Sequence, residues 1–82
     1  MNQAIQFPDR EIWNEAAQAV CFPALMHGMQ LTCAISGESL RSRFGDTDPL
    51  ESFRLHRWDL EEEASDAISD QQEDERGWFW LS

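Results

Sequence analysis

The chain has 82 residues, the size of one small domain, and 41% of them are hydrophobic, including four Trp and five Phe. This aromatic content excludes a disordered chain, because such chains lack the apolar residues needed to form a core. The net charge of −10, with arginine as the only basic residue type apart from two His, disfavours direct binding to nucleic acid, because phosphates would be repelled. We therefore expect one folded domain over residues 1–82.

The N-terminal segment Met1–Pro8 has neither a basic start nor a long apolar stretch, so it does not predict a signal peptide. No segment approaches the ~20 consecutive apolar residues that a membrane span needs. We expect a cytoplasmic protein that does not enter a membrane. Cys21 and Cys33 lack the spacing of a metal-binding CxxC motif, and we expect no metal and no cofactor.

Two short segments precede the main sheet. Residues Gln3–Phe7 alternate between polar and apolar side chains and are followed by Pro8, which predicts a short strand. For Asp9–Ala17 we expect a loop with one helical turn, capped by Asp9. Trp13 in this segment should pack into the core, because an indole is seldom left in water.

The segment Gln18–Ile35 predicts a β-hairpin with its turn at His27-Gly28, where Gly28 can adopt a positive φ. A turn at this place puts apolar residues opposite one another on a single face, as a buried sheet face requires. The expected pairs are Met26–Met29, Ala24–Leu31, Phe22–Cys33 and Val20–Ile35. Cys21 then lies on the other face from Cys33, so we expect no disulfide between them.

Two helices are expected after the hairpin. Ser36 should cap a short helix whose Leu40 and Phe44 face inward and which ends at Gly45. Asp48-Pro49 then starts a second, long helix that should continue to about Gln72. Its apolar stripe is predicted to pack on the hairpin and consists of Leu50, Phe53, Leu60, Ala64, Ala67 and Ile68.

The opposite face of the long helix is acidic, and residues 59–75 hold more than half of the 16 acidic residues. A solvated exterior is the simplest interpretation, and an acidic decoy that occupies a basic nucleic-acid-binding protein is the alternative. The run Glu61-Glu62-Glu63 does not predict a metal site, because neighbouring helical residues point about 100° apart.

Arg57 lies on the apolar stripe of the long helix, where a charge must be paired. One interpretation is that its stem packs in the core and its guanidinium reaches a carboxylate or carbonyls. The other is an anion-binding site that Arg57 forms with Arg54 for a carboxylate or phosphate. The cysteines could pair with His27 or His56 as nucleophile and base, but buried structural cysteines are the simpler reading, so no catalytic residue is predicted.

The chain closes with an aromatic segment, Gly77–Ser82, whose composition predicts a strand. Trp78 and Trp80 would lie on one face, with Phe79 and Leu81 on the other. Because both faces are apolar, either the strand is buried on both sides or a partner chain covers one side. We therefore consider Trp78–Leu81 a candidate interface, for instance in a homodimer.

One set of residues has a fairly specific spacing, namely Phe7, Trp13, Ala19–Ala24, Gly28, Cys33–Ser36, Leu40 and Phe53–Arg57. In these residues the chain resembles a small bacterial family catalogued as domain of unknown function 1488. The resemblance covers Phe7 to about Ile68, and the aromatic tail matches least. It implies a compact α+β domain with a hairpin sheet and C-terminal helices, and no assigned activity, cofactor or catalytic residue.

The predicted fold is an α+β domain in the order β-β-β-α-α-β, with a small, mainly antiparallel sheet packed against one short and one long C-terminal helix. The predicted function is a non-enzymatic interaction or regulatory module with an unknown protein partner. Two alternatives remain open. One is the acidic decoy, and the other is a binder of small anions through Arg54 and Arg57, with a pocket near His56 and Trp58.

Overall fold

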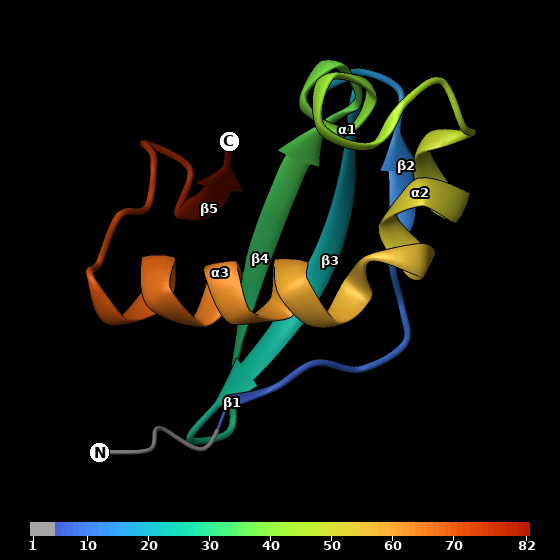
Figure 1. The fold of residues 1–82 in the computed structure, drawn as a ribbon. Coiled ribbons are helices and arrows are strands. Elements are labelled where there is room, and N and C mark those ends of the chain that lie inside the picture. The colour runs from blue at the N-terminus through green and yellow to red at the C-terminus, as the bar shows by residue number, and fades with distance from the viewer. Residues whose placement is uncertain (1–4) are drawn as a thin grey trace.

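The computed structural model describes residues 5–82 (Figure 1). Its elements follow one another in the order β-β-β-β-α-α-α-β. None of the helices in this range is both long and apolar enough to cross a membrane. The elements are β1 (Ile5–Gln6), β2 (Ile12–Asn14), β3 (Ala19–Met26), β4 (Met29–Ser36), α1 (Gly37–Phe44), α2 (Pro49–Leu55), α3 (Arg57–Ser69) and β5 (Trp78–Leu81).

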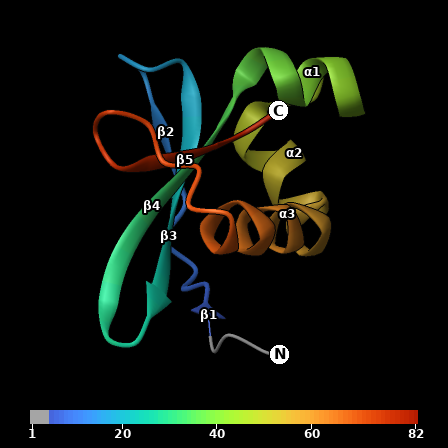
Figure 2. The ribbon, with the colours of Figure 1, turned by 90° about the vertical axis from the view of Figure 1, so that its left-hand side faces the viewer.

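The strands form one mixed sheet in the order β1-β3-β4-β5, in which β2 also pairs with β3. All strand pairs within the described range are antiparallel except β4–β5, which is parallel because the three helices connect these strands. The helices lie together on one side of the sheet (Figure 2). The predicted α+β class, with helices packed on a mainly antiparallel sheet, is confirmed.

The hairpin has the predicted register, including Val20 opposite Ile35 and Phe22 opposite Cys33. Its turn residues, His27 and Gly28, both have positive φ, of 55° and 77°, as a type I′ turn requires. Because neighbouring strand residues face opposite sides, the two free thiols, of Cys21 and Cys33, lie on different faces of the sheet.

The core lies between the hairpin and the helices, as predicted. Phe22 of β3 and Phe53 of α2 meet there with ring centroids 4.7 Å apart. Burying each of these side chains stabilises the fold by roughly 1.5–3 kcal/mol. The other large side chains of this core come from the hairpin, α1, α3 and β5, namely Val20, Ile35, Leu40, Leu60, Ile68, Phe79 and Leu81.

The prediction of a helical turn in Asp9–Ala17 is wrong. Ile12–Asn14 forms β2 and pairs with Ala19–Cys21. The strand forms because the free edge of β3 offers partners to its backbone, which local preference cannot reveal. Trp13 is half-buried and packs against the core. Its ring lies so close to Gly37 that a Cβ at that position would be 3.0 Å away.

The first strand is shorter than predicted and ends at Gln6, while Gln3 and Ala4 lie outside the described residues. The helix starts are as predicted. The Ser36 hydroxyl accepts a hydrogen bond from the Ser39 amide, and the Asp48 carboxylate accepts one from the Glu51 amide. Gly45 follows α1 with a φ of 101°.

The prediction of one long helix to Gln72 is also wrong, because the backbone breaks at His56. The His56 imidazole stacks on the Phe44 ring at a centroid distance of 3.7 Å, and its Nδ1 lies 3.0 Å from the Ser52 carbonyl oxygen. These contacts hold His56 outside helical geometry, at φ −115° and ψ 23°. The second part of the predicted long helix is α3, which ends at Ser69.

Ser52 provides a test of the packing around this break. Its hydroxyl oxygen is buried and has no hydrogen-bond partner in the described part of the chain. We expect Ser52→Ala to raise the free energy of unfolding by about 1 kcal/mol, because the substitution removes an unsatisfied polar atom and favours the helix. Urea unfolding would measure the change.

The matched control is Ser65→Ala on α3, which changes helix propensity at a half-buried site and should gain only a few tenths of a kcal/mol. A loss of stability in Ser52→Ala would contradict the idea that this hydroxyl is unsatisfied.

Candidate functional site

Arg57, the first residue of α3, is surrounded by three carboxylates. Its Nε donates to Glu61 at 2.6 Å, its Nη1 donates to Glu11 at 2.7 Å, and its Nη2 lies 2.9 Å from Asp9. Glu61 is one helical turn away, whereas Asp9 and Glu11 come from the segment between β1 and β2. This guanidinium therefore joins the start of α3 to the N-terminal part of the chain.

The same side chain binds the backbone of that segment. Nη2 of Arg57 also donates to the carbonyl oxygens of Phe7 and Pro8, at 3.3 and 3.0 Å. The guanidinium carbon lies 5.6 Å from the centroid of the Phe53 ring. Planar geometry with donors on three nitrogens lets one arginine make all these contacts, which lysine could not do.

Glu11 is the carboxylate that brings the two predicted arginines together. One of its oxygens accepts from Arg57, and the other accepts from Nε of Arg54 at 2.8 Å. Its side chain is only 8% exposed. Burial alone would raise the pKa of Glu11, but the hydrogen bonds from both arginines outweigh burial and lower this pKa from 4.5 to about 2.

For Arg57, burial acts to lower the pKa, and the hydrogen bonds to Glu11 and Glu61 outweigh it and raise the pKa. The guanidinium of Arg57 is therefore charged at neutral pH. Sequence reasoning singled out Arg54 and Arg57 and missed Glu11, because nothing in its local sequence shows that its side chain meets α2 and α3.

A shallow hollow of about 380 Å³ adjoins this cluster and is lined by Arg54, Leu55, Arg57, Trp58 and Glu61. His56 is not part of its lining, since its ring stacks on Phe44. An anion bound here would have to compete with Glu11 for both arginines, because each already donates a hydrogen bond to this carboxylate.

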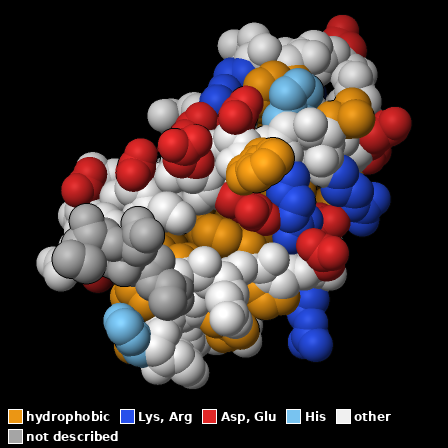
Figure 3. All heavy atoms as spheres, turned by 60° about the horizontal axis from the view of Figure 1, so that its bottom comes forward, with side chains coloured by type: hydrophobic (Ala, Val, Ile, Leu, Met, Phe, Trp, Pro, Cys, Tyr) orange, Lys and Arg blue, Asp and Glu red, His pale blue; other side chains and the backbone are white. Residues whose placement is uncertain are grey.

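The most exposed large hydrophobic side chains of the described residues lie beside this cluster. Trp58 is 87% exposed and Leu55 is 69% exposed. A second hollow on the other side of Trp58 is lined by Ile5, Phe7, Glu61, Glu62 and Ser65. Figure 3 views the molecule with its lower side forward and shows hydrophobic side chains there among charged ones.

The aromatic tail forms β5, and its two faces differ. Phe79 and Leu81 are buried in the main core. Trp78 and Trp80 are half-buried on the opposite face, where they pack against Ala19, Cys21 and Ala34. Two of the four candidate interface residues are therefore inaccessible to a partner while the chain is folded.

Asp74 holds this tail in place. Its carboxylate accepts hydrogen bonds from the Trp78 amide at 2.9 Å and from the Trp80 indole at 2.8 Å. These bonds lower the pKa of Asp74, with the backbone bond to Trp78 as the main cause. The Arg76 guanidinium lies 4.0 Å from the centroid of the Trp78 ring.

Other candidate groups are dispersed. Among residues 5–82, no cluster of His, Cys, Asp or Glu has the geometry to hold a metal ion. Burial raises the pKa of both thiols, that of Cys33 to about 12. A thiol with such a pKa is a poor nucleophile at neutral pH, because little thiolate is present. His27 is exposed at the hairpin turn.

The pKa of Glu11 predicts how stability depends on pH. Because the pKa is lowered in the folded state, the stabilisation is present above pH 4.5 and is lost as pH falls toward about 2. We expect Glu11→Gln to lower the free energy of unfolding at neutral pH by about 3 kcal/mol and to flatten its decline below pH 4.5. Urea unfolding at a series of pH values measures both effects.

Glu75→Gln is the control, since Glu75 lies exposed in the loop before β5 and should change stability by less than about 0.5 kcal/mol. A Glu11→Gln variant with the acid-induced loss of the wild-type protein would show that this carboxylate does not carry the effect.

The comparisons with known proteins agree with the resemblance seen in the sequence. The family described as "Protein of unknown function (DUF1488)" matches residues 5–81, which includes the aromatic tail. Two relatives named "Uncharacterized protein YrdB", from Escherichia coli K12 and Shigella flexneri, are each 69% identical to the chain, with 99% of both sequences covered.

A crystal structure of a DUF1488 protein of unknown function from Shewanella loihica PV-4 has the same fold, with a TM-score of 0.93 and 28% sequence identity. The match covers 99% of this chain and 94% of that one. The chain therefore belongs to the DUF1488 family of bacterial proteins of unknown function.

Proposed function

We propose that the protein is a non-enzymatic interaction module that binds a partner protein through Leu55 and Trp58, which we call the Trp58 surface. The observation that carries this proposal is the exposure of Trp58, at 87%, in a chain that otherwise buries or half-buries its Trp and Phe side chains. Tryptophan is the residue type most enriched among those that dominate binding energy at protein interfaces.

The surroundings of Trp58 favour this role. Two hollows flank the indole, and each combines apolar and charged residues, as interfaces commonly do. The start of α3 is held by the contacts of Arg57 with Glu11 and Glu61. An anchor on a fixed helix loses little freedom on binding, which leaves more of the contact energy as affinity.

The charge around the Trp58 surface indicates the kind of partner. Asp59 and Glu62 are exposed on the same helix, and the arginines nearby are already paired with carboxylates. We therefore expect an apolar pocket with a basic rim on the partner. Such complementarity chiefly speeds association and weakens with salt.

The test is capture of partner proteins from a bacterial extract by immobilised wild-type protein and by a Trp58→Ser variant. We expect the specifically captured protein to bind Trp58→Ser at least about 30-fold more weakly, which corresponds to the ~2 kcal/mol of a dominant interface residue. Direct titration of the purified partner measures this ratio at low and at high salt.

Met29→Ser is the matched control, because Met29 is also apolar and 58% exposed but lies at the hairpin turn. Thermal unfolding should show that both variants are folded. Equal affinity of the wild-type protein and Trp58→Ser for every captured protein would sink the proposal.

The same experiment separates the alternatives. An acidic decoy predicts that a basic nucleic-acid-binding protein is captured and is released by nucleic acid. A homodimer predicts self-association in sedimentation equilibrium, lost in Trp58→Ser if this surface forms it and retained if Trp78 and Trp80 form it. The proposal places the protein in the cytoplasm, where its two cysteines would stay reduced.

A further inference from the structure

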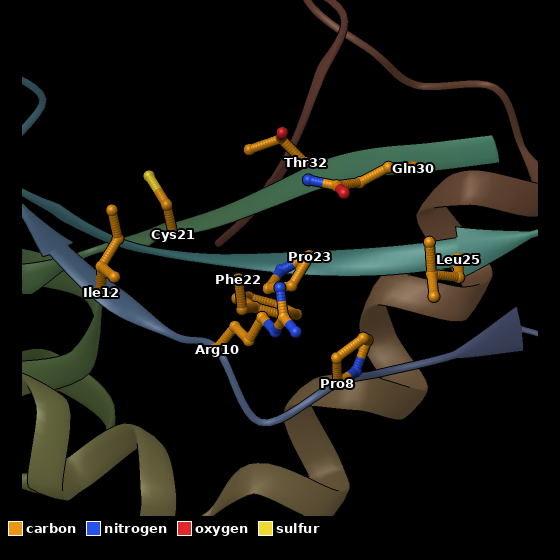
Figure 4. A pocket seen from close by; sticks show the side chains of 9 residues that line it. All are labelled: Pro8, Arg10, Ile12, Cys21, Phe22, Pro23, Leu25, Gln30 and Thr32. Carbon is orange, nitrogen blue, oxygen red and sulfur yellow. The ribbon is translucent and has the colours of Figure 1, made fainter.

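The face of the sheet opposite the helices has a hollow of about 360 Å³ that the sequence did not predict. Figure 4 shows side chains of β3 and β4 around it, together with those of the segment before β2. This volume is at the lower end of the range of small-molecule sites, about 300–1,000 Å³. The lining residues used below are Arg10, Ile12, Pro23, Leu25, Gln30 and Thr32.

The hollow exists because β3 has two short partners on one edge. β1 pairs with Leu25 and Met26, and β2 pairs with Ala19–Cys21, so the chain between β1 and β2 leaves the edge near Pro23. In a two-residue hairpin, the residue pair next to the turn is hydrogen-bonded, and hydrogen-bonded and non-hydrogen-bonded pairs then alternate along the strands. Since Met26–Met29 is the pair next to the turn, Pro23–Thr32 is a non-hydrogen-bonded pair. The nitrogen of Pro23 therefore points away from β4, toward the edge where no N–H donor is needed.

Arg10 is the polar residue that distinguishes this hollow. The other five arginines each lie within 4.0 Å of a carboxylate, and Arg10 is the only arginine with no carboxylate partner in the described part of the chain. It is exposed, and Figure 4 shows it extending from the segment before β2 toward Pro23. An uncompensated cation is unusual in a chain of net charge −10.

The position of Arg10 follows from the contacts of Arg57. Arg57 binds Pro8, Asp9 and Glu11 on the helix side of the sheet. These contacts fix the residues on both sides of Arg10 on the helix side of the sheet. The Arg10 side chain therefore extends toward the opposite face of the sheet. The cation is therefore placed by a packed segment, which reduces the freedom that it would lose on binding a ligand.

We propose that this hollow binds a small amphiphilic carboxylate. Arg10 would bind the carboxylate through two parallel N–H donors, the strongest arrangement for this pair of groups. The Gln30 amide and the Thr32 hydroxyl on β4 offer further hydrogen bonds. The alkyl part would lie on Ile12, Pro23 and Leu25, of which Ile12 is 57% exposed in the free protein.

The chemistry of the lining favours a carboxylate over other anions. A phosphate group carries more charge and is usually bound by several cations or backbone amides, whereas this hollow has one arginine. The modest volume favours a short alkyl chain over a long fatty acid. The site lies on the face of the sheet away from the helices and is independent of the Trp58 surface.

The experiment is a titration of the full chain with octanoate, followed by two-dimensional amide NMR spectra. We expect saturable shifts at Leu25, Gln30 and Thr32. Arg10→Gln should raise the dissociation constant about tenfold or more, as expected when a charged hydrogen bond is lost. Arg41→Gln is the matched control, because Arg41 is exposed on α1, away from the hollow, and its guanidinium lies 3.7 Å from the Asp46 carboxylate.

Two further probes have the same alkyl chain, octylamine with the opposite charge and 1-octanol with none. Weaker binding of both would support the role of Arg10. Three outcomes would overturn the proposal. The first is equal binding of octanol and octanoate, and the second is an unchanged dissociation constant in Arg10→Gln. The third is the absence of saturation up to ~10 mM octanoate, which corresponds to a binding free energy weaker than ~3 kcal/mol.

Discussion

The ion pair between Arg57 and Glu11 connects the start of α3 to the N-terminal segment before β2, and the positions of two surfaces of the molecule depend on it. Arg57 begins α3, whereas Glu11 precedes β2, and the latter's side chain is 8% exposed. Breaking a buried pair of this kind costs about 3–5 kcal/mol, a large share of the 5–15 kcal/mol that stabilises a typical domain. The segment between β1 and β2 is too short for its own core and depends on this contact.

The ion pair does not by itself create the fold. Burial of the hairpin face against Phe53, Leu60 and Ile68 supplies the larger driving force, since each such side chain contributes roughly 1.5–3 kcal/mol. Taking charges out of water offsets most of their attraction. The contacts of Arg57 with Asp9, Glu11 and Glu61 fix the relative position of α3 and the segment before β2, because hydrogen bonds are directional and apolar contacts are not. They place Trp58 on one side of the molecule and Arg10 on the other.

Two surfaces of different character result. At the Trp58 surface, exposed apolar side chains lie among charged ones, and we propose that a partner protein binds there; the hollow beside Arg10 is small, and for it we propose a ligand with one anionic group. In the aromatic tail, which the sequence marks as a candidate interface, only Trp78 and Trp80 remain partly exposed. Phe79 and Leu81 complete the core, and Asp74 binds the Trp80 indole.

Sequence patterns alone predict the hairpin with its register, the caps of α1 and α2, the apolar stripe and the alternation in β5. These features depend on residues close together in the chain or on strict periodicity. Four features became visible only in the folded chain, namely β2, the break at His56, the partner of Arg57 and the exposure of Trp58. Each of these depends on contacts between distant segments, such as Phe44 with His56 or Glu11 with Arg57, which no local pattern records.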